Sequence, residues 1–244
     1  MSIKIIKCQN INDKISVSKK LSKLNSQLLN YEILIFKSAF DKKKLIKIRK
    51  DAFKFGISTS QKKPDNTFGS VRKSVHRIDN NVKKMRVACI NHMYQFAEND
   101  INFKTFHKVV KTMNDFRNRL LNINESEFSK NGIKKGYVSR PVIKHYPIGG
   151  GYMSAHTDKL IDKYSLQLII PLSEKGENYQ DGGLSIKDKN GTWIDVEKYL
   201  KLGDFILCRP DLEHRVREID KYDKSLKWKS ERGKWSLIGI LDKF

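Results

Sequence analysis

Short β-rich runs follow one another through the second half of the 244-residue chain. From about residue 136 they are YVSRPVIKHYP, SLQLIIPLSE, GGLSIKD, TWIDV, DFILCRP and WSLIGIL, and turn signals such as Asp-Gly-Gly and Asn-Gly separate them. Regularly spaced runs of this length are typical of a β-sandwich or a barrel. We therefore predict a double-sheet jelly roll of about eight strands, a double-stranded β-helix, over residues 136–244.

The first part of the chain has a different pattern. YEILIFKSAF at 31–40 predicts a short apolar strand, and the segment 41–56 predicts a helix with Asp41 as its N-cap and Gly56 as its stop. Residues 57–80 contain proline, glycine and several short polar side chains, so we predict a loop there.

Two further segments, 81–100 and 103–121, have apolar residues at helical spacing and predict amphipathic helices. The polar stretch 122–132 is the best candidate boundary before the β-rich part. We expect residues 1–135 to form a strand-and-helix support region whose helices pack on the outer face of the jelly roll, within the same domain. The predicted fold class is α+β, mainly β.

Composition excludes several classes of protein. Hydrophobic residues make up 39% of the chain, and no run of about twenty apolar residues could form a transmembrane helix. The amino terminus has no apolar core of a secretory signal, so a cytoplasmic location is expected. Cys8, Cys89 and Cys208 form no C-x-x-C pair, which favours reduced thiols over disulfides or structural zinc.

The net charge of +22 raises the question of a nucleic-acid partner. Of the 49 basic residues, 38 are lysine and 11 are arginine, and they are spread along the whole chain. A dispersed charge predicts weak, salt-sensitive binding, so we expect no specific nucleic-acid partner. An anionic small molecule and a membrane surface stay open as partners of the basic surface.

The stretch HYPIGGGYMSAHTD contains the residues that carry chemistry. On a strand, His156 and Asp158 would point to the same face, because one residue separates them. His214 follows 58 residues later, just after the strand-like DFILCRP. Two imidazoles and one carboxylate on one side of a metal leave the other side open, which is the arrangement of non-haem Fe(II) oxygenases.

Residues 136–244 resemble the Fe(II)/2-oxoglutarate-dependent dioxygenases, and in particular their prolyl-4-hydroxylase-like members. The family pattern is H-x-D, a distal histidine and a later basic residue with a small polar partner; His156, Asp158 and His214 match its first part. The resemblance implies Fe(II), 2-oxoglutarate and O2 as cofactors. It also implies that Lys234 and Ser236 of Gly-Lys-Trp-Ser, with Tyr146, bind 2-oxoglutarate.

The spacing departs from the family pattern, because Lys234 lies twenty residues after His214 and therefore farther than usual. The intervening polar segment 218–232 could form a loop over the site. Arginines between the distal histidine and Lys234 are therefore alternative anchors for 2-oxoglutarate: Arg215, Arg217 and Arg232.

The function expected from these residues is hydroxylation of a small molecule, such as an amino acid or a sugar-like metabolite, with release of succinate and CO2. A hydroxylase or demethylase of a protein or nucleic acid is the alternative, and a non-catalytic metal-binding jelly roll is a further one. The substrate-binding candidates Arg72, His76 and Arg77 fall in the predicted loop, where a solvated charge run is the competing interpretation.

Overall fold

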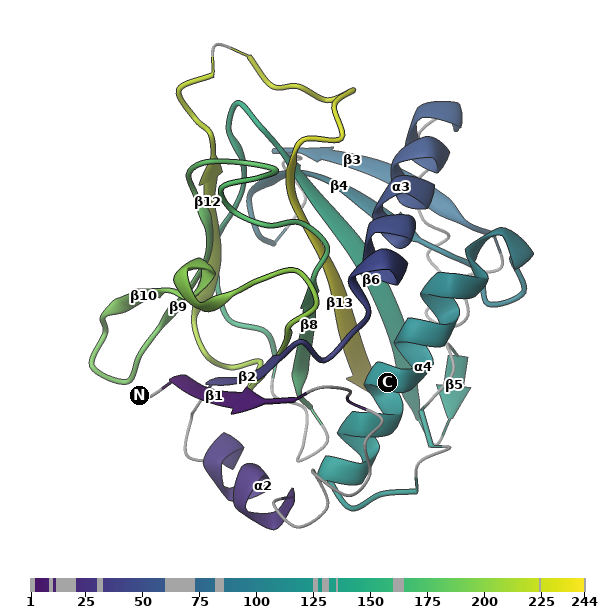
Figure 1. Ribbon diagram of the computed structural model, residues 1–244, viewed down its shortest axis with the longest axis vertical. Coiled ribbons are helices and arrows are strands. Elements are labelled where there is room, and N and C mark those ends of the chain that lie inside the picture. The colour runs from purple at the N-terminus through teal and green to yellow at the C-terminus, as the bar shows by residue number, and fades with distance from the viewer. Residues whose placement is uncertain are drawn as a thin grey trace.

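One curled mixed β-sheet dominates the described part of the chain (Figure 1). The computed structural model describes residues 3–8, 11, 21–29, 33–59, 73–81, 86–124, 127–128, 132–134, 136–159, 165–223 and 225–243. Its N-terminal elements are β1 (Ile3–Lys7), α2 (Leu21–Leu29), β2 (Ile33–Lys37), α3 (Lys42–Ser58), β3 (Val75–Asn80), β4 (Cys89–Gln95), the 3₁₀ turn η1 (Ile101–Phe103) and α4 (Lys104–Leu120).

The C-terminal elements are almost entirely strands. They are β5 (Gly132–Lys134), β6 (Tyr137–Pro147), β7 (Gly151–His156), β8 (Gln167–Pro171), β9 (Gly183–Lys187), β10 (Trp193–Asp195), η2 (Val196–Tyr199), β11 (Phe205–Cys208), β12 (His214–Ile219) and β13 (Gly233–Lys243). The β-rich second half predicted from the sequence is confirmed, and the fold is mainly β and like a jelly roll.

The strand order is β1-β2-β11-β8-β13-β6-β4-β7-β12-β9-β10, with β3 paired to β4 and β5 paired to β6. The longest ladder joins β13 to β6, where Lys234 lies opposite Tyr146 and Ser236 lies opposite Lys144. Because side chains alternate along a strand, these four residues share the face that lines the central cavity. The intervening Trp235 packs on the opposite face, in the main hydrophobic core.

The two long helices lie beside β6 and β13 (Figure 1). Leu45 and Ile48 of α3 belong to the same buried cluster as Phe106 of α4 and Leu237 of β13. α3 begins as predicted, since the Asp41 side chain accepts a hydrogen bond from the backbone N–H of Lys43. It ends at Ser58 and not at Gly56.

Gly56 does not end α3; it allows α3 and β4 to approach each other closely. A Cβ at this position would lie 2.8 Å from the Tyr94 hydroxyl oxygen on β4. The glycine therefore lets α3 pack directly against the Tyr94 ring.

Two local predictions in the first half are wrong. The segment 81–100 contains the strand β4 instead of a helix, and residues 75–80, expected in a loop, form its partner strand β3. The reason is tertiary: β4 pairs with both β6 and β7, and almost all its residues are buried. Apolar residues on both faces of a strand can imitate helical periodicity, and the pairing then decides between the two.

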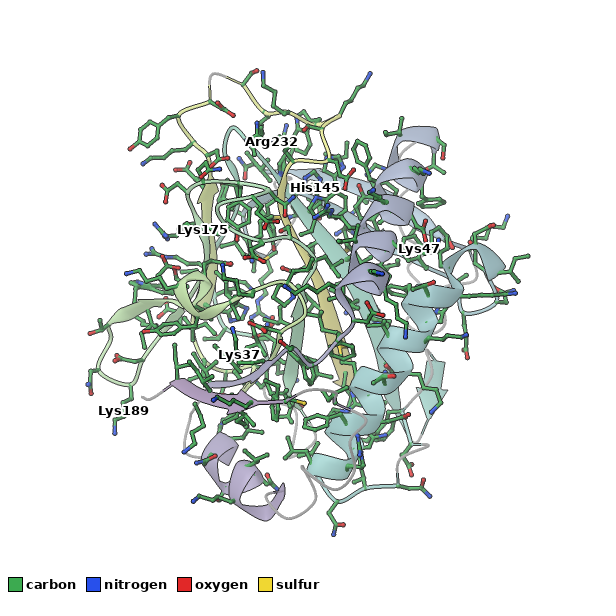
Figure 2. All side chains as sticks on the ribbon, viewed as in Figure 1. Lys37, Lys47, His145, Lys175, Lys189 and Arg232 are labelled. Atoms are coloured by element: carbon green, nitrogen blue, oxygen red, sulfur yellow. The ribbon has the colours of Figure 1, made fainter. Side chains whose placement is uncertain are left out.

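The described helices include none that is long and apolar enough to cross a membrane. Basic side chains come from many separate elements, as the labelled Lys37 on β2, Lys47 on α3, Lys175 after β8 and Lys189 after β9 illustrate (Figure 2). This distribution agrees with the dispersed charge seen in the sequence.

Candidate active site

A cavity of about 300 Å³ lies inside the curled sheet. Side chains from β6, β7, β8, β9, β12 and β13 and from the segment just after β7 line it. They include all six of the metal and cosubstrate residues expected from the sequence: Tyr146, His156, Asp158, His214, Lys234 and Ser236. Residues that lie far apart in the chain therefore share one enclosed space.

The three metal-ligand candidates converge on the cavity wall. β7 ends at His156 and β12 begins at His214, and the two residues face each other across the antiparallel ladder. The Nε2 atom of His156 is 3.9 Å from Asp158 Oδ1, and Nε2 of His214 is 3.7 Å from Asp158 Oδ2. Among the described residues, these three form a group whose ligand atoms all lie within 4.8 Å of one another.

Backbone carbonyl oxygens fix the tautomer of each imidazole. His156 Nδ1 lies 2.9 Å from the Ser154 carbonyl oxygen, and His214 Nδ1 lies 2.9 Å from that of Leu212. A carbonyl oxygen only accepts, so each Nδ1 carries the proton and each Nε2 keeps a lone pair that can bind a metal. Both lone pairs belong to the atoms that face Asp158, so the donor set fits a divalent metal.

Burial, together with the neighbouring His156, lowers the pKa of His214 below its ordinary value. The imidazole is therefore neutral near pH 7, which is the form that binds metals. Asp158 is the exposed member of the group, and its backbone N–H donates to the Pro210 carbonyl oxygen at 2.9 Å.

Gln167 on β8 reaches the same group from across the cavity. Its Nε2 lies 3.2 Å from Asp158 Oδ2 and 3.2 Å from His214 Nε2. The Cys208 thiol lies 3.5 Å from the amide oxygen of Gln167, which leaves the NH₂ group directed at the ligands. The sequence interpretation missed Gln167, although a polar residue within the apolar run SLQLIIPL was a usable signal.

Gln167→Leu is expected to lower metal affinity by roughly 10- to 100-fold, because an amide that orients a ligating carboxylate is lost. Calorimetric titration with Mn(II) measures the change. Gln167→Glu is a second variant of similar size whose side chain can donate a hydrogen bond only when its carboxyl group is protonated. Metal affinity unchanged in Gln167→Leu would remove the residue from the metal centre.

The cosubstrate candidates lie deeper in the cavity. Lys234 and Ser236 are each 3% exposed, and Tyr146 is 2% exposed. Lys234 Nζ pairs with Glu197 Oε1 at 2.5 Å. Burial raises the pKa of the Tyr146 hydroxyl, so the phenol stays protonated and can donate a hydrogen bond.

None of the three alternative arginines lines this cavity. The guanidinium of Arg215 lies over the Trp193 ring at 4.1 Å, and that of Arg217 pairs with Asp195 at 3.0 Å. Arg232 is exposed, and its carbonyl oxygen accepts from His145. The geometry thus favours Lys234 over all three.

The extra segment 218–232 does not contribute described residues to the cavity wall. Lys227 N–H instead donates to the Ile148 carbonyl oxygen, and the Trp228 ring packs edge-on against His92. The long spacing between His214 and Lys234 therefore reflects a loop that folds along the β6–β7 turn and β4.

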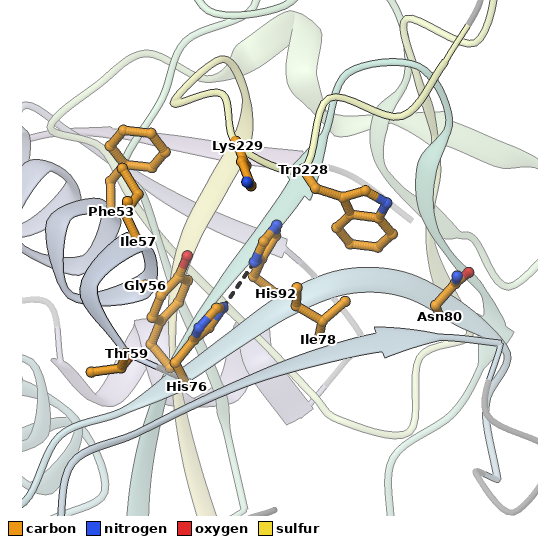
Figure 3. A pocket seen from close by; sticks show the side chains of 11 residues that line it. Phe53, Gly56, Ile57, Thr59, His76, Ile78, Asn80, His92, Trp228 and Lys229 are labelled. Carbon is orange, nitrogen blue, oxygen red and sulfur yellow. Dashed lines mark hydrogen bonds between the residues drawn. The ribbon is translucent and has the colours of Figure 1, made fainter. Parts of the chain in front are cut away.

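The substrate candidates from the N-terminal half do not come together. Arg72 lies outside the described residues, and His76 and Arg77 are neighbours on β3 that point to opposite faces. Arg77 pairs with Asp79 at 2.6 Å. His76 lines a second cavity, where its Nε2 hydrogen-bonds His92 Nδ1 at 2.9 Å (Figure 3).

This second cavity lies on the opposite side of the sheet from the metal group. Figure 3 shows His76 and His92 beside Phe53, Ile57 and Trp228 there. None of its described lining residues also lines the metal cavity.

Comparison with known proteins finds likeness in structure alone. No protein-family model and no curated protein matches the sequence. A Pseudomonas putida prolyl-4-hydroxylase matches with a TM-score of 0.57 at 12% identity, covering 92% of this chain and 100% of that one. A full-length Neurospora crassa protein, in complex with alpha-ketoglutarate and thymine, matches with a TM-score of 0.59 at 13% identity, covering 99% and 86%.

A Trichoplax adhaerens prolyl hydroxylase, in complex with a peptide fragment of hypoxia inducible factor, matches with a TM-score of 0.57 at 12% identity over 97% and 96% of the two chains. The chain has the Fe(II)/2-oxoglutarate oxygenase fold. Each of the three matches covers 92% or more of the chain.

Proposed function

We propose that this protein is an Fe(II)- and 2-oxoglutarate-dependent dioxygenase that hydroxylates a small molecule. One observation carries the proposal: His156, Asp158 and His214 direct their ligand atoms at one another in the cavity that also contains Lys234 and Ser236. A metal group next to a buried cation and a hydroxyl matches the needs of a metal-chelating dicarboxylate cosubstrate.

The chain's own residues divide into three roles. His156 and His214 would hold Fe(II) as neutral nitrogen donors, and Asp158 would hold it as a carboxylate. Lys234 and Ser236 would bind the distal carboxylate of 2-oxoglutarate through an ammonium and a hydroxyl, with the Tyr146 phenol as a further donor. Bound Fe(II) supplies the oxidising chemistry, in which O2 converts 2-oxoglutarate to succinate and CO2 and places one oxygen atom on the substrate as a hydroxyl.

Apolar side chains form part of the remaining cavity wall, among them Val142, Ile169, Leu184 and Val216, and the basic residues Arg86, Arg140, Lys144 and Lys159 also line it. The apolar side chains would limit the access of water to the reacting groups, which protects an oxidising site from side reactions, although Asp158 itself is exposed.

The size and the charge of the cavity indicate the kind of substrate. A space of about 300 Å³ is at the small end of ligand pockets, so it suits a metabolite better than a folded macromolecule. Lys144 lines it, is 8% exposed, and shares the Asp79 carboxylate with Arg77. Two cations around one carboxylate leave an excess of positive charge, which favours a substrate with a carboxylate or phosphate group.

Succinate release from 2-oxoglutarate tests the proposal, with Fe(II)-loaded protein and separate pools of amino acids, organic acids, sugar phosphates, peptides and methylated oligonucleotides. We expect an anionic metabolite to stimulate release and to gain one oxygen atom by mass spectrometry. Stimulation by peptides or by methylated oligonucleotides alone would instead support the macromolecular alternative. Absence of 2-oxoglutarate binding and turnover in all pools would support the non-catalytic jelly roll.

A further inference from the structure

Glu197 lies directly behind the candidate cosubstrate anchor. It belongs to the short turn η2 and is 6% exposed, but it is not among the described residues that line the metal cavity. Its Oε1 contacts Lys234 Nζ at 2.5 Å. The Lys234 ammonium therefore stands between a buried carboxylate and the space where a cosubstrate would bind.

Two further donors hold the Glu197 carboxylate. The backbone N–H of Leu184 donates to Oε1 at 2.7 Å, and the Tyr179 hydroxyl donates to Oε2 at 2.7 Å. Burial by itself would raise the pKa of Glu197, but Lys234 and these hydrogen bonds keep its pKa below the ordinary value. The side chain is thus an ionised carboxylate inside the protein.

The surrounding backbone is shaped to admit this side chain. Asp195 caps η2 by accepting from the Glu197 N–H at 3.1 Å. Gly183 has φ +106°, and a Cβ there would lie 2.4 Å from Glu197 Cγ. Gly183 therefore has a backbone conformation that favours glycine and leaves the space that the Glu197 side chain fills. This indicates that the Glu197 carboxylate has a fixed position in the fold.

The pair Lys234–Glu197 has no net charge. An incoming distal carboxylate would meet a cation whose charge is already balanced, and it would face a second carboxylate across the same ammonium. Such an arrangement holds the lysine in position but lowers its attraction for anions.

We propose that Glu197 is an internal counter-ion that positions Lys234 and weakens dicarboxylate binding, so that 2-oxoglutarate and succinate are held less tightly than a lone lysine would hold them. The inference rests on the proposed function of Lys234. Glu197 belongs neither to the cavity lining nor to the metal group, so it would act through Lys234 as a positioning residue.

Glu197→Gln is the decisive variant, because the amide is isosteric and still accepts from Lys234 and Leu184 while the negative charge is lost. Two carboxylates on either side of one ammonium are about 6 Å apart, and at an effective dielectric near 20 their repulsion corresponds to roughly 100-fold in affinity. Screening reduces this, so we expect 2-oxoglutarate and succinate to bind about tenfold to 100-fold more tightly. Anaerobic calorimetry with Mn(II)-loaded protein measures both dissociation constants.

Pyruvate is the matched control ligand, because it retains the keto acid but lacks the distal carboxylate. Its dissociation constant should be the same in the wild type and in Glu197→Gln. Glu174→Gln is the matched control variant: Glu174 pairs with Lys201 at 2.7 Å, and neither residue lines the cavity. It should leave all three dissociation constants unchanged.

If Glu197 only supported the fold, Glu197→Gln would damage the site and weaken 2-oxoglutarate binding, which is the opposite of the expected change. Weaker 2-oxoglutarate binding in Glu197→Gln, or an equal change for pyruvate, would overturn the proposal. If Glu197→Gln does not fold, Glu197→Asp draws the carboxylate back by one methylene and should tighten dicarboxylate binding by a smaller factor; unchanged or weaker binding there also overturns it.

The outcomes separate this inference from the proposed function. If wild-type protein with Mn(II) binds no 2-oxoglutarate, the proposed function fails. If the wild type binds 2-oxoglutarate and Lys234→Ala weakens that binding, but Glu197→Gln does not strengthen it, the inference about Glu197 alone fails.

Discussion

His214→Ala is expected to lose tight binding of Fe(II) and, with it, turnover of 2-oxoglutarate. His214 would supply one of three ligand atoms, and its removal leaves only His156 and Asp158 to bind the metal. The loss of metal affinity should exceed roughly 10- to 100-fold, which is the loss expected when a residue that only hydrogen-bonds to a metal ligand is removed. Metal content after dialysis and calorimetric titration with Mn(II) measure it.

His107→Gln is a suitable control, because His107 lies on α4 and is not part of the metal group. It should keep the metal stoichiometry of the wild type. Wild-type iron stoichiometry and succinate release in His214→Ala would show that the assigned triad is wrong.

Lys234→Ala is expected to raise the dissociation constant of 2-oxoglutarate about 30- to 150-fold, which corresponds to roughly 2–3 kcal/mol for one charge-assisted contact. Metal affinity should stay unchanged, since Lys234 is not in the metal group. The same substitution leaves the buried Glu197 carboxylate without its cation, so the free energy of unfolding should fall by roughly 3–5 kcal/mol. Calorimetry and urea denaturation measure the two effects separately.

The double variant Lys234→Ala/Glu197→Gln separates binding from stability. Removing the unpaired carboxylate should recover much of the lost unfolding free energy, while 2-oxoglutarate binding stays weak. Arg217→Ala is the control at an alternative anchor and should bind 2-oxoglutarate like the wild type. A large loss in Arg217→Ala together with normal binding in Lys234→Ala would move the anchor to Arg217.

Local spacing was sufficient to predict that the side chains of His156 and Asp158 lie close together, and their Nε2 and Oδ1 atoms are 3.9 Å apart. His156 and Asp158 lie two residues apart at the end of a strand, and the strand pairing in the structure places His214 opposite His156. The prediction used the alternation of side chains along a strand, which is a local property of the sequence, but β7 ends at His156 and Asp158 lies just beyond it. The same alternation predicts that Lys234 and Ser236 share a face, and both line the cavity.

Local periodicity failed where a strand is buried on both sides. Residues 89–95 are almost all buried, and β4 pairs with β3, β6 and β7. The sequence of the segment 81–100 does not reveal which strands pair with it, so the spacing of its apolar residues also fits a helix. The neighbouring β3 was missed for the same reason, since its strand conformation depends on β4.

The order of residues along the chain was enough to predict the β-rich second half, the sequence of the metal-ligand candidates, and a basic residue and a hydroxyl on one face of the same strand. The tertiary structure was needed to place Lys234, and none of the three alternative arginines, at the cavity wall. It also brings Glu197 to Lys234 and Gln167 to Asp158. Lys234, Glu197 and Gln167 come from three separate elements, β13, η2 and β8. These contacts form only when the sheet curls. Because Lys234 and Glu197 are then buried, each stays charged only with the help of a partner that is distant in sequence.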